Sequence, residues 1–595
     1  MELLVVVVLG LLGIAAATAV GPRLGVAAPL LLVIVGIGVS LLPFVPEIEV
    51  DPEFILAGVI PPLLYSASVS MPAMEFRREF SAIGGLSVGL VVVSSIVLGL
   101  LFTWLIPGMG FAAGLALGAI VSPTDAVATS IVKRLGVSSR LVTVLEGESL
   151  LNDATALVLL RSAIVATGVS VTFWDVLGDF VFAVVVAVVI GYVVGKANLW
   201  VRERVTDPTV NTVISFTVPF LASVPSEALG ASGLVAAVVA GLVTGRGAVT
   251  RLSPQHRASD TQAWRTVELI LEGTVFLLMG LEMAAIVADV QGGRSDIAGG
   301  IVIALVALFF VLVVRTLYVF PTLRIQRRRV LRSARAREGL AGMQARLDGL
   351  DAGRAHAAGV RDLLGAPGPE ATTARLSVFR SRIRRKVADI EYFTAVPLGW
   401  REGTVIVWAG MRGALTLAAA QTLPADLPDR SLLVFVAFVV AAASLIVQGG
   451  TLPMVVRWVK PAREDRAAVA ADREEIDGML REVARTMAEE AAAEPVGPGG
   501  ESRADRGAGT DDGSGAGSGA GSGAGSGAGP DAGRARSADR IRFRLRVIEE
   551  QRAVLAVQRD EGRFSSTALT GVLEALDAAQ ISLELRLPSG DVSES

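Results

Sequence analysis

Residues 146–153 read Glu-Gly-Glu-Ser-Leu-Leu-Asn-Asp and lead into a long apolar stretch. On a helix, Ser149 lies one turn before Asp153 on the same face, and Glu148 has the same relation to Asn152. A charged side chain inside an apolar span is costly, so Asp153 is a functional candidate by default. Burial penalises the ionised form of an unpaired carboxyl group, and Asp153 should therefore bind either a proton or a cation. The alternative is a buried aspartate held by neighbouring hydrogen bonds.

The preceding apolar stretch places a proline next to a second carboxylate. Residues 118–126 read Gly-Ala-Ile-Val-Ser-Pro-Thr-Asp-Ala. Pro123 has no backbone N–H and leaves a carbonyl oxygen free within the span, and Thr124 and Asp125 follow at once. Transporters build cation sites from an interrupted helix with free carbonyl oxygens and a carboxylate; the alternative is a kink with Asp125 as a helix cap. The hydroxyl of Ser149 would be a further ligand for a hard monovalent cation.

The composition indicates a membrane protein built of helices. Of the 595 residues, 52% are hydrophobic and the mean hydropathy is +0.59, which is typical of a chain that spans a membrane. Aromatic residues make up only 5%, which disfavours a β-barrel with aromatic girdles. The net charge of −3 argues against a nucleic-acid partner, and the lack of cysteine excludes disulfides and thiolate metal sites. His256 and His356 lie in polar segments, which excludes a histidine relay within the membrane.

The apolar stretches predict an all-α polytopic protein with about thirteen transmembrane helices in a lipid bilayer. Each stretch approaches the roughly 20 mainly apolar residues that a span needs. The first stretch lacks the basic residues that open a signal peptide and is interpreted as a span, with a cleaved signal peptide as the alternative. The predicted spans are residues 2–20, 24–44, 53–70, 82–106, 111–133, 149–168, 174–196, 209–225, 229–246, 265–287, 296–321, 402–424 and 430–458.

Basic residues alternate from loop to loop, which predicts the orientation of the chain. Positive charge marks the cytoplasmic side, and the loops after the even-numbered spans are poor in Arg and Lys. The pattern predicts a protein of the bacterial plasma membrane with its N-terminus outside and its C-terminus in the cytoplasm. The loops after the odd-numbered spans contain Arg23; Arg77 and Arg78; Lys133, Arg134 and Arg140; Lys196, Arg202 and Arg204; Arg246, Arg251 and Arg257; Arg324, Arg327, Arg328 and Arg329; Arg457 and Lys460.

The same pattern divides the chain into four regions. Spans 1–11 occupy residues 1–322, a helical cytoplasmic insertion occupies 323–400, spans 12 and 13 occupy 401–460, and a cytoplasmic tail occupies 461–595. The insertion is rich in Arg. The tail contains helix-prone parts joined by a Gly/Ser/Ala repeat at 507–534, which is typical of a flexible linker. Two interpretations of the tail stay open, a solvated appendage and a regulatory element.

The twelfth predicted span also carries a charge. Residues 410–413 read Gly-Met-Arg-Gly; a buried Arg412 needs a partner, and the flanking glycines suggest a second interrupted helix. If inverted repeats of six spans surround span 7, spans 5 and 12 correspond, and such a pair indicates a site at the membrane midplane. Arg161, Glu272 and Glu282 also lie in or near spans, where they either take part in function, pair with other side chains or line an aqueous surface.

Three motifs closely resemble the monovalent cation:proton antiporter 1 family, the bacterial Na⁺/H⁺ antiporters related to eukaryotic sodium/proton exchangers. These motifs are residues 122–125, 147–153 and 410–413, and the resemblance covers roughly residues 1–460. It implies a homodimer in which a core of spans 4–6 and 11–13 moves like an elevator against a dimer domain. The protein would then be a secondary transporter serving pH homeostasis, not an enzyme, and would need no cofactor.

The resemblance also implies roles for individual residues. Glu148 and Arg412 would form a structural ion pair that holds two crossed helices together. No metal is implied beyond the transported monovalent cation. The ion and the proton would bind at a set of oxygen-bearing residues with Asp153 as the principal carrier: Asp153, Asp125, Ser149, Thr124 and Asn152.

The Asn152-Asp153 pair resembles the electroneutral branch of the family. A neutral Asn152 leaves one exchangeable carboxylate, which favours one cation per proton. The chain departs from its relatives in span 3, where they often have an acidic residue shortly after a Pro-Pro pair; here Pro61 and Pro62 are followed by Ser66. A third acidic ligand from span 3 is therefore not expected. The insertion at 323–400 is also longer than the usual connection.

Several alternatives stay open at this point. Na⁺ is the first candidate for the transported ion, but Li⁺ and K⁺ also suit oxygen ligands, so a K⁺/H⁺ antiporter is an alternative. A passive cation channel would need a pore loop, and the sequence has no repeated one. A membrane sensor that signals through the tail would need an output domain, whereas the tail offers only helices and a linker.

Overall fold

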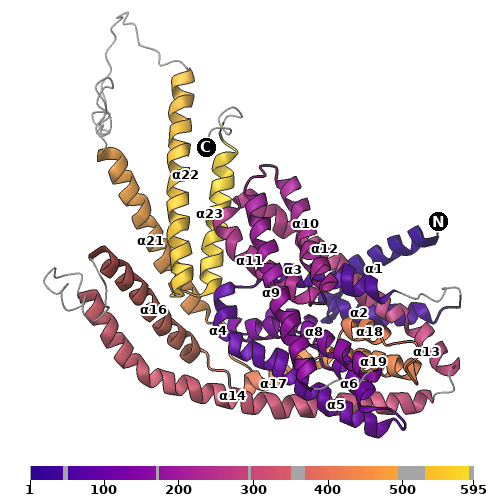
Figure 1. The fold of residues 1–595 in the computed structure, drawn as a ribbon. Coiled ribbons are helices and arrows are strands. Elements are labelled where there is room, and N and C mark those ends of the chain that lie inside the picture. The colour runs from indigo at the N-terminus through magenta and orange to yellow at the C-terminus, as the bar shows by residue number, and fades with distance from the viewer. Residues whose placement is uncertain are drawn as a thin grey trace, which may run out of the picture. The chain divides into compact units, whose positions relative to one another are not determined.

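The computed structural model describes residues 2–43, 51–168, 173–292, 296–349, 369–493 and 530–587, and these residues are almost entirely helical (Figure 1). The predicted all-α fold class is confirmed. The chain divides into two compact units. The first consists of Met1–Asp465 with Glu561–Ser566, and the second of Arg466–Asp560 with Thr567–Ser595.

The predicted spans overlap helices, or consecutive helical segments, of the first unit, and their number of about thirteen stays a prediction. By length and composition, eight helical segments in the described ranges could cross a membrane, and three shorter apolar helices accompany them. The helices of the first unit are α1 (Glu2–Leu24), α2 (Ala28–Ser40), η1 (Phe54–Val59), α3 (Ile60–Ser70), α4 (Ala73–Gly84), η2 (Gly85–Leu90), α5 (Val91–Leu105), α6 (Phe111–Val121), α7 (Val127–Arg134), α8 (Ser139–Gly168), α9 (Phe173–Arg202), α10 (Pro208–Ala228), α11 (Gly233–Arg251), α12 (Pro254–Leu281), α13 (Met283–Gly292), α14 (Ile297–Gly349), α16 (Pro369–Ala395), α17 (Trp400–Trp408), α18 (Ala414–Gln421), α19 (Arg430–Ser444), η4 (Leu445–Gly449) and α20 (Gly450–Val459).

Two of the predicted spans are interrupted, and their interruptions lie against each other. The gap between α6 and α7 spans residues 122–126 and contains Pro123, which cannot donate a helical hydrogen bond. The gap between α17 and α18 spans residues 409–413. The backbone N–H of Asp125 in the first gap donates to the carbonyl oxygen of Met411 in the second, at 2.8 Å. The backbone groups that each break frees are therefore partly satisfied by the other break.

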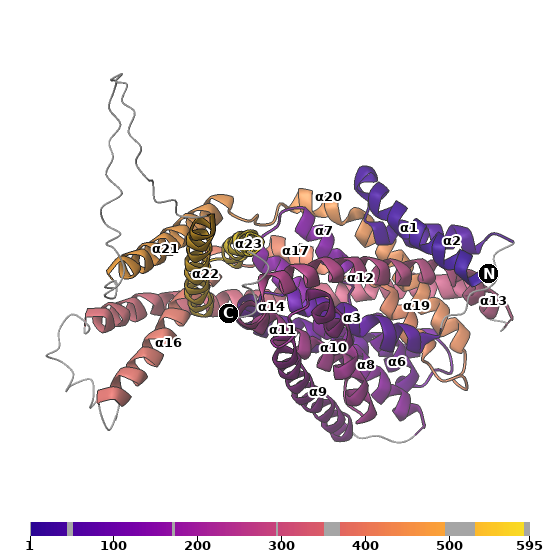
Figure 2. The same ribbon diagram turned by 90° about the horizontal axis from the view of Figure 1, so that it is seen from above.

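The membrane helices of the first unit form two groups. In the scaffold group, α12 packs on α1 and α2, while α11 packs on α3, α9 and α10 (Figure 2). In the core group, α6 packs on α5, α8 and α18, while α19 packs on α14 and α18. Small residues allow the close contacts: a Cβ on Gly36 of α2 would lie 2.6 Å from the carbonyl oxygen of Leu277 in α12.

The helix α14 continues well past its apolar part, and α16 packs back against it. Both views show the two helices together at one end of the first unit (Figures 1 and 2). The C-terminal end of α16 is fixed to α4 and α8: Arg78 Nε lies 2.5 Å from Asp389 Oδ1, and Arg140 Nη1 donates to the carbonyl oxygen of Val396 at 2.5 Å. The predicted insertion is therefore anchored to the membrane helices at this end.

The described residues of the second unit form three helices, α21 (Arg466–Ala493), α22 (Pro530–Glu561) and α23 (Ser566–Glu584). Gln551 Nε2 of α22 donates to the carbonyl oxygen of Leu480 in α21 at 2.9 Å. Arg552 of α22 forms an ion pair with Asp577 of α23 at 2.5 Å. Most of the predicted linker at 507–534 lies outside the described residues.

Candidate ion-binding site

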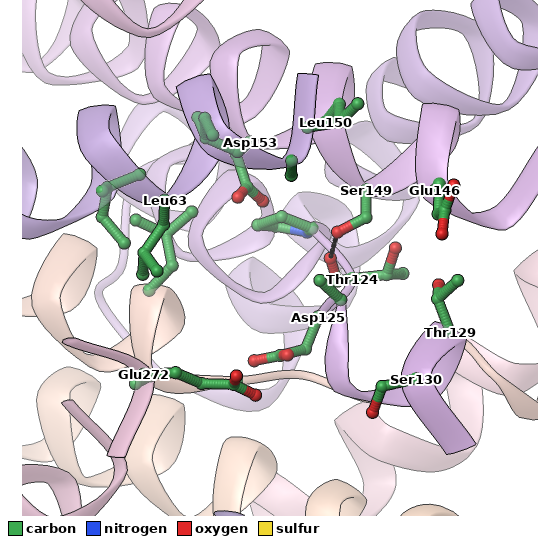
Figure 3. Close-up of a pocket in the computed structure, with 18 of the residues that line it drawn as sticks. Leu63, Thr124, Asp125, Thr129, Ser130, Glu146, Ser149, Leu150, Asp153 and Glu272 are labelled. Atoms are coloured by element: carbon green, nitrogen blue, oxygen red, sulfur yellow. Dashed lines mark hydrogen bonds between the residues drawn. The ribbon is translucent and has the colours of Figure 1, made fainter. Parts of the chain in front are cut away.

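A cavity of about 340 Å³ lies between the scaffold and core groups, next to the break between α6 and α7. The core group contributes Asp125 from the break and Asp153 from α8, while α12 of the scaffold group contributes Glu268 and Glu272. Figure 3 shows the carboxylates of Asp125, Asp153 and Glu272 around the same space. The two aspartates that the sequence singled out are therefore brought together, although 28 residues separate them in the chain.

Asn152 and Ser149 hold the broken backbone at Thr124. Asn152 Nδ2 donates to the hydroxyl oxygen of Thr124 at 2.7 Å and to its carbonyl oxygen at 3.3 Å. Ser149 Oγ donates to the same carbonyl oxygen at 3.3 Å (Figure 3). All three side chains are buried. Asn152 thus positions the interrupted segment as a hydrogen-bond donor, which an aspartate at this position could not do when ionised.

Asp125 is fixed by the two helix breaks. Its Oδ1 accepts a hydrogen bond from the backbone N–H of Val127 at 2.8 Å, at the start of α7. Its Oδ2 faces Gly413, where an added Cβ would overlap the carboxylate. Asp125 therefore accepts a hydrogen bond from the first residue of the half-helix α7 and also lines the cavity. The glycine of the second interruption leaves room for this carboxylate.

Asp153 has a different environment. Its side chain lines the cavity, and within the described residues its carboxylate accepts no hydrogen bond and forms no ion pair; the charge that acts on it is that of Asp125. The carboxylate thus faces the cavity without a partner among the described residues. The alternative of a buried aspartate held by hydrogen bonds does not fit this geometry.

The predicted ion pair between Glu148 and Arg412 is corrected by the structure. Glu148 instead pairs with Arg315 of α14, through distances of 2.5 Å from Nη1 to Oε1 and 3.0 Å from Nη2 to Oε2. Both side chains are at most 3% exposed. Arg315 is not among the candidates predicted above, although a charge in the apolar span 296–321 is itself a signal.

Arg412 satisfies backbone carbonyl groups that the two helix breaks leave free. Its Nε donates to the carbonyl oxygen of Val121 at 2.8 Å and its Nη2 to that of Ser122 at 3.3 Å. Its Nη1 contacts the carbonyl oxygen of Gly410. A guanidinium group has five N–H donors and can serve several carbonyl groups at once, so Arg412 still joins the crossed helices, but through their backbones.

Only one of the three remaining charged candidates reaches the cavity. Glu272 lines it together with the two aspartates (Figure 3). Arg161 pairs with Glu227 at 3.4 Å, and Glu282 accepts a hydrogen bond from Gln421 at 3.0 Å. The helix α3 lines the cavity with Ile60, Leu63, Leu64, Ala67 and Ser70, none of which is acidic.

The two crossed, interrupted helices and the carboxylates beside them define a membrane transporter of the cation:proton antiporter class. The model of the family described as sodium/hydrogen exchanger, transmembrane, matches residues 7–346 and 379–458, and the chain belongs to this family. The interval between the two matched parts, residues 347–378, lies within the predicted insertion at 323–400.

Individual relatives agree with this family, and a solved structure shares the fold. The chain is 28% identical over 466 residues to the uncharacterized Na⁺/H⁺ exchanger Rv2287 of Mycobacterium tuberculosis, covering 77% of this chain and 74% of the relative. It is 29% identical over 470 residues to the uncharacterized Na⁺/H⁺ exchanger YjcE of Escherichia coli, covering 75% of each. The sodium proton antiporter MjNhaP1 of Methanocaldococcus jannaschii has the same fold, with a TM-score of 0.54 at 16% identity over 77% of this chain and 99% of that protein.

Proposed function

We propose that the protein exchanges a monovalent cation for a proton across the plasma membrane, with Na⁺ as the first candidate. The observation that carries the proposal is the Asp153 carboxylate, which lines the cavity without a hydrogen bond from a described residue, next to Asp125. An unpaired carboxylate in such a place binds either a proton or a cation. Competition for one group couples the two ions and produces antiport.

In the proposed site, the cation binds between Asp153 and Asp125 and takes up further oxygen ligands from Ser149 and Thr124. Thr124 is buried within the break and Ser149 is buried beside it on α8, and carboxylate, hydroxyl and carbonyl oxygens suit Na⁺, Li⁺ and K⁺ alike. A K⁺/H⁺ antiporter is therefore the alternative. Asn152 is neutral and serves as a donor to Thr124, which supports exchange of one cation for one proton.

Alternating access would arise from movement of the core group against the scaffold group, like an elevator. The cavity is lined by both groups, because Asp125 and Asp153 come from one and Glu272 from the other. We also propose a homodimer, on the basis of the family resemblance. The alternation of basic residues between loops supports an N-terminus outside and a C-terminus in the cytoplasm. Glu268 and Glu272 would then attract cations at the cytoplasmic entrance to the site.

Transport in everted membrane vesicles tests the function. Na⁺, Li⁺ or K⁺ added to vesicles with an acidified lumen should dissipate the pH gradient, and the three ions compared across pH give the selectivity. Asp153→Asn should abolish the response, whereas Asp477→Asn on the exposed surface of α21 removes the same charge and should leave it unchanged. Undiminished exchange in Asp153→Asn would refute the role of Asp153.

A further inference from the structure

The second helix break separates two backbone groups that a continuous helix would join. In an α-helix the N–H of Arg412 would donate to the carbonyl oxygen of Trp408, four residues earlier, but the break at residues 409–413 lies between them. The Arg412 N–H instead donates to Ser444 Oγ at 2.9 Å. Gln448 Nε2 donates to the Trp408 carbonyl oxygen at 3.3 Å. Two side chains of the following span therefore replace the two halves of one helical hydrogen bond.

Ser444 and Gln448 lie at the end of α19 and within η4, four residues apart and on one face of the span. Their exposed fractions are 0% and 1%, so solvent does not reach either side chain. Among the described residues, no group donates a hydrogen bond to Gln448 Oε1. A buried amide oxygen without a donor costs free energy. A role in stability alone would therefore favour an apolar side chain of similar length at this position.

Thr451 continues the same face three residues after Gln448. Its Oγ1 accepts a hydrogen bond from the indole N–H of Trp408 at 2.9 Å, so this span holds both the backbone and the side chain of Trp408. The span also approaches the break closely at Gly449, where an added Cβ would lie 3.1 Å from the sulfur atom of Met411. The last residue of α17 and the middle of the break are thus both fixed against this span.

The residues held in this way position Asp125. Met411 lies between Trp408 and Arg412 in the chain, and its carbonyl oxygen accepts the N–H of Asp125 at 2.8 Å. Gly413 follows Arg412 directly and faces the Asp125 carboxylate. Where Trp408 and Arg412 are held therefore determines both the acceptor for the Asp125 backbone and the space for its side chain.

The first break is held in a similar way by the span that follows it. Ser149 and Asn152 of α8 donate to Thr124 in that break, as the side chains of α19 and η4 hold the second. In the predicted repeats of six spans, the two holding spans are the sixth and the thirteenth and correspond to each other. The sixth also carries a carboxylate of the cavity, whereas residues 444–451 contain no charged residue. The second break is therefore held by neutral groups alone on this side.

We propose that Ser444 and Gln448 are positioning residues of the ion site, which clamp the second break and thereby fix Asp125. Neither side chain lines the cavity, so both act through the backbone and not as ligands of the ion. The clamp lies within the core group and would keep the site intact while that group moves. Its effect on transport rests on the proposed function, whereas its effect on the backbone does not.

Amide hydrogen exchange of the purified full-length protein in detergent tests the effect on the backbone. Ser444→Ala removes the hydroxyl group, and Gln448→Met removes the amide group while keeping the length of the side chain. In each variant the backbone amides of residues 122–127 and 409–413 should exchange about fivefold faster, the effect of one lost hydrogen bond. Faster exchange at 409–413 without a change at 122–127 would overturn the link to Asp125, and no change at either break would overturn the clamp itself.

A matched control separates the clamp from the loss of any buried hydroxyl group. Ser226 of α10 is 0% exposed, and its Oγ donates to the carbonyl oxygen of Ala222 in the same helix at 2.7 Å. Ser226→Ala should leave exchange at both breaks unchanged. Equal acceleration at the breaks in this variant would show that a general loss of stability, and not the clamp, causes the effect.

Dissipation of the pH gradient in vesicles tests the effect on ion binding, with whichever of Na⁺, Li⁺ and K⁺ the wild type exchanges. Ser444→Ala and Gln448→Met should each raise the apparent KM for that cation about fivefold, with a smaller change in the maximal rate at equal amounts of protein. A purely structural role would lower the maximal rate and leave KM unchanged, which would overturn the proposal. A wild type that exchanges none of these cations would refute the proposed function, and hydrogen exchange would still decide whether the clamp exists.

Discussion

The backbone N–H of Asp125 donates a hydrogen bond to the carbonyl oxygen of Met411 at 2.8 Å, and this bond joins the two interrupted helices at their breaks. It places Gly413 directly against the Asp125 carboxylate. The candidate site is therefore shaped by two segments that lie 286 residues apart in the chain. Each break supplies what the other lacks: one provides the carboxylate, and the other provides the carbonyl acceptor and the space.

Gly413→Ala should abolish transport while leaving the protein in the membrane. The added Cβ would overlap the Asp125 carboxylate and displace it from the cavity. Gly84→Ala is the matched control, because a Cβ there meets nothing within 4 Å. The pH-gradient assay in vesicles, with equal amounts of each variant by immunoblot, measures the effect. Wild-type exchange in Gly413→Ala would show that Asp125 does not depend on this space.

Arg315→Leu should destabilise the protein by about 3–5 kcal/mol, because it leaves Glu148 charged and unpaired in a buried position. The double variant Glu148→Leu/Arg315→Leu should recover much of this loss, since replacement of both partners removes the buried charge. Thermal unfolding in detergent compares the two. If both variants are equally destabilised, the ion pair is not the source of the effect.

Exchange should be insensitive to the membrane potential, because one cation replaces one proton at Asp153. In proteoliposomes, a potential set with K⁺ and valinomycin should leave the initial rate of Na⁺-driven proton movement unchanged. Asn152→Asp should lower transport, because an ionised carboxylate cannot donate to Thr124 as the amide does. A rate that rises with an inside-negative potential would contradict one-to-one exchange.

The sequence predicted the helix breaks and the residues of the site better than it predicted which side chains pair with each other. Pro123 and the flanking glycines of Arg412 predicted the helix breaks, because backbone chemistry is local. The partner of Glu148 could not be assigned in the same way: Arg315 and Arg412 are both basic residues in apolar spans, and only packing decides which one reaches the carboxylate. The anchoring of α16 by Arg78 likewise depends on contacts between segments more than 300 residues apart.

The sequence left the role of Glu272 open, and its position in the cavity leads to a specific prediction. It lies on α12 of the scaffold group and lines the same cavity as Asp125 and Asp153, so it should attract the cation without travelling with it. Glu272→Gln should therefore raise the apparent KM for Na⁺ several-fold, by the loss of one nearby negative charge, and change the maximal rate little. Glu203→Gln, an exposed position on the same group, controls for loss of a carboxylate. The dependence of pH-gradient dissipation in vesicles on the Na⁺ concentration separates the apparent KM from the maximal rate. A collapse of the maximal rate with unchanged KM would instead place Glu272 in the carrier step itself.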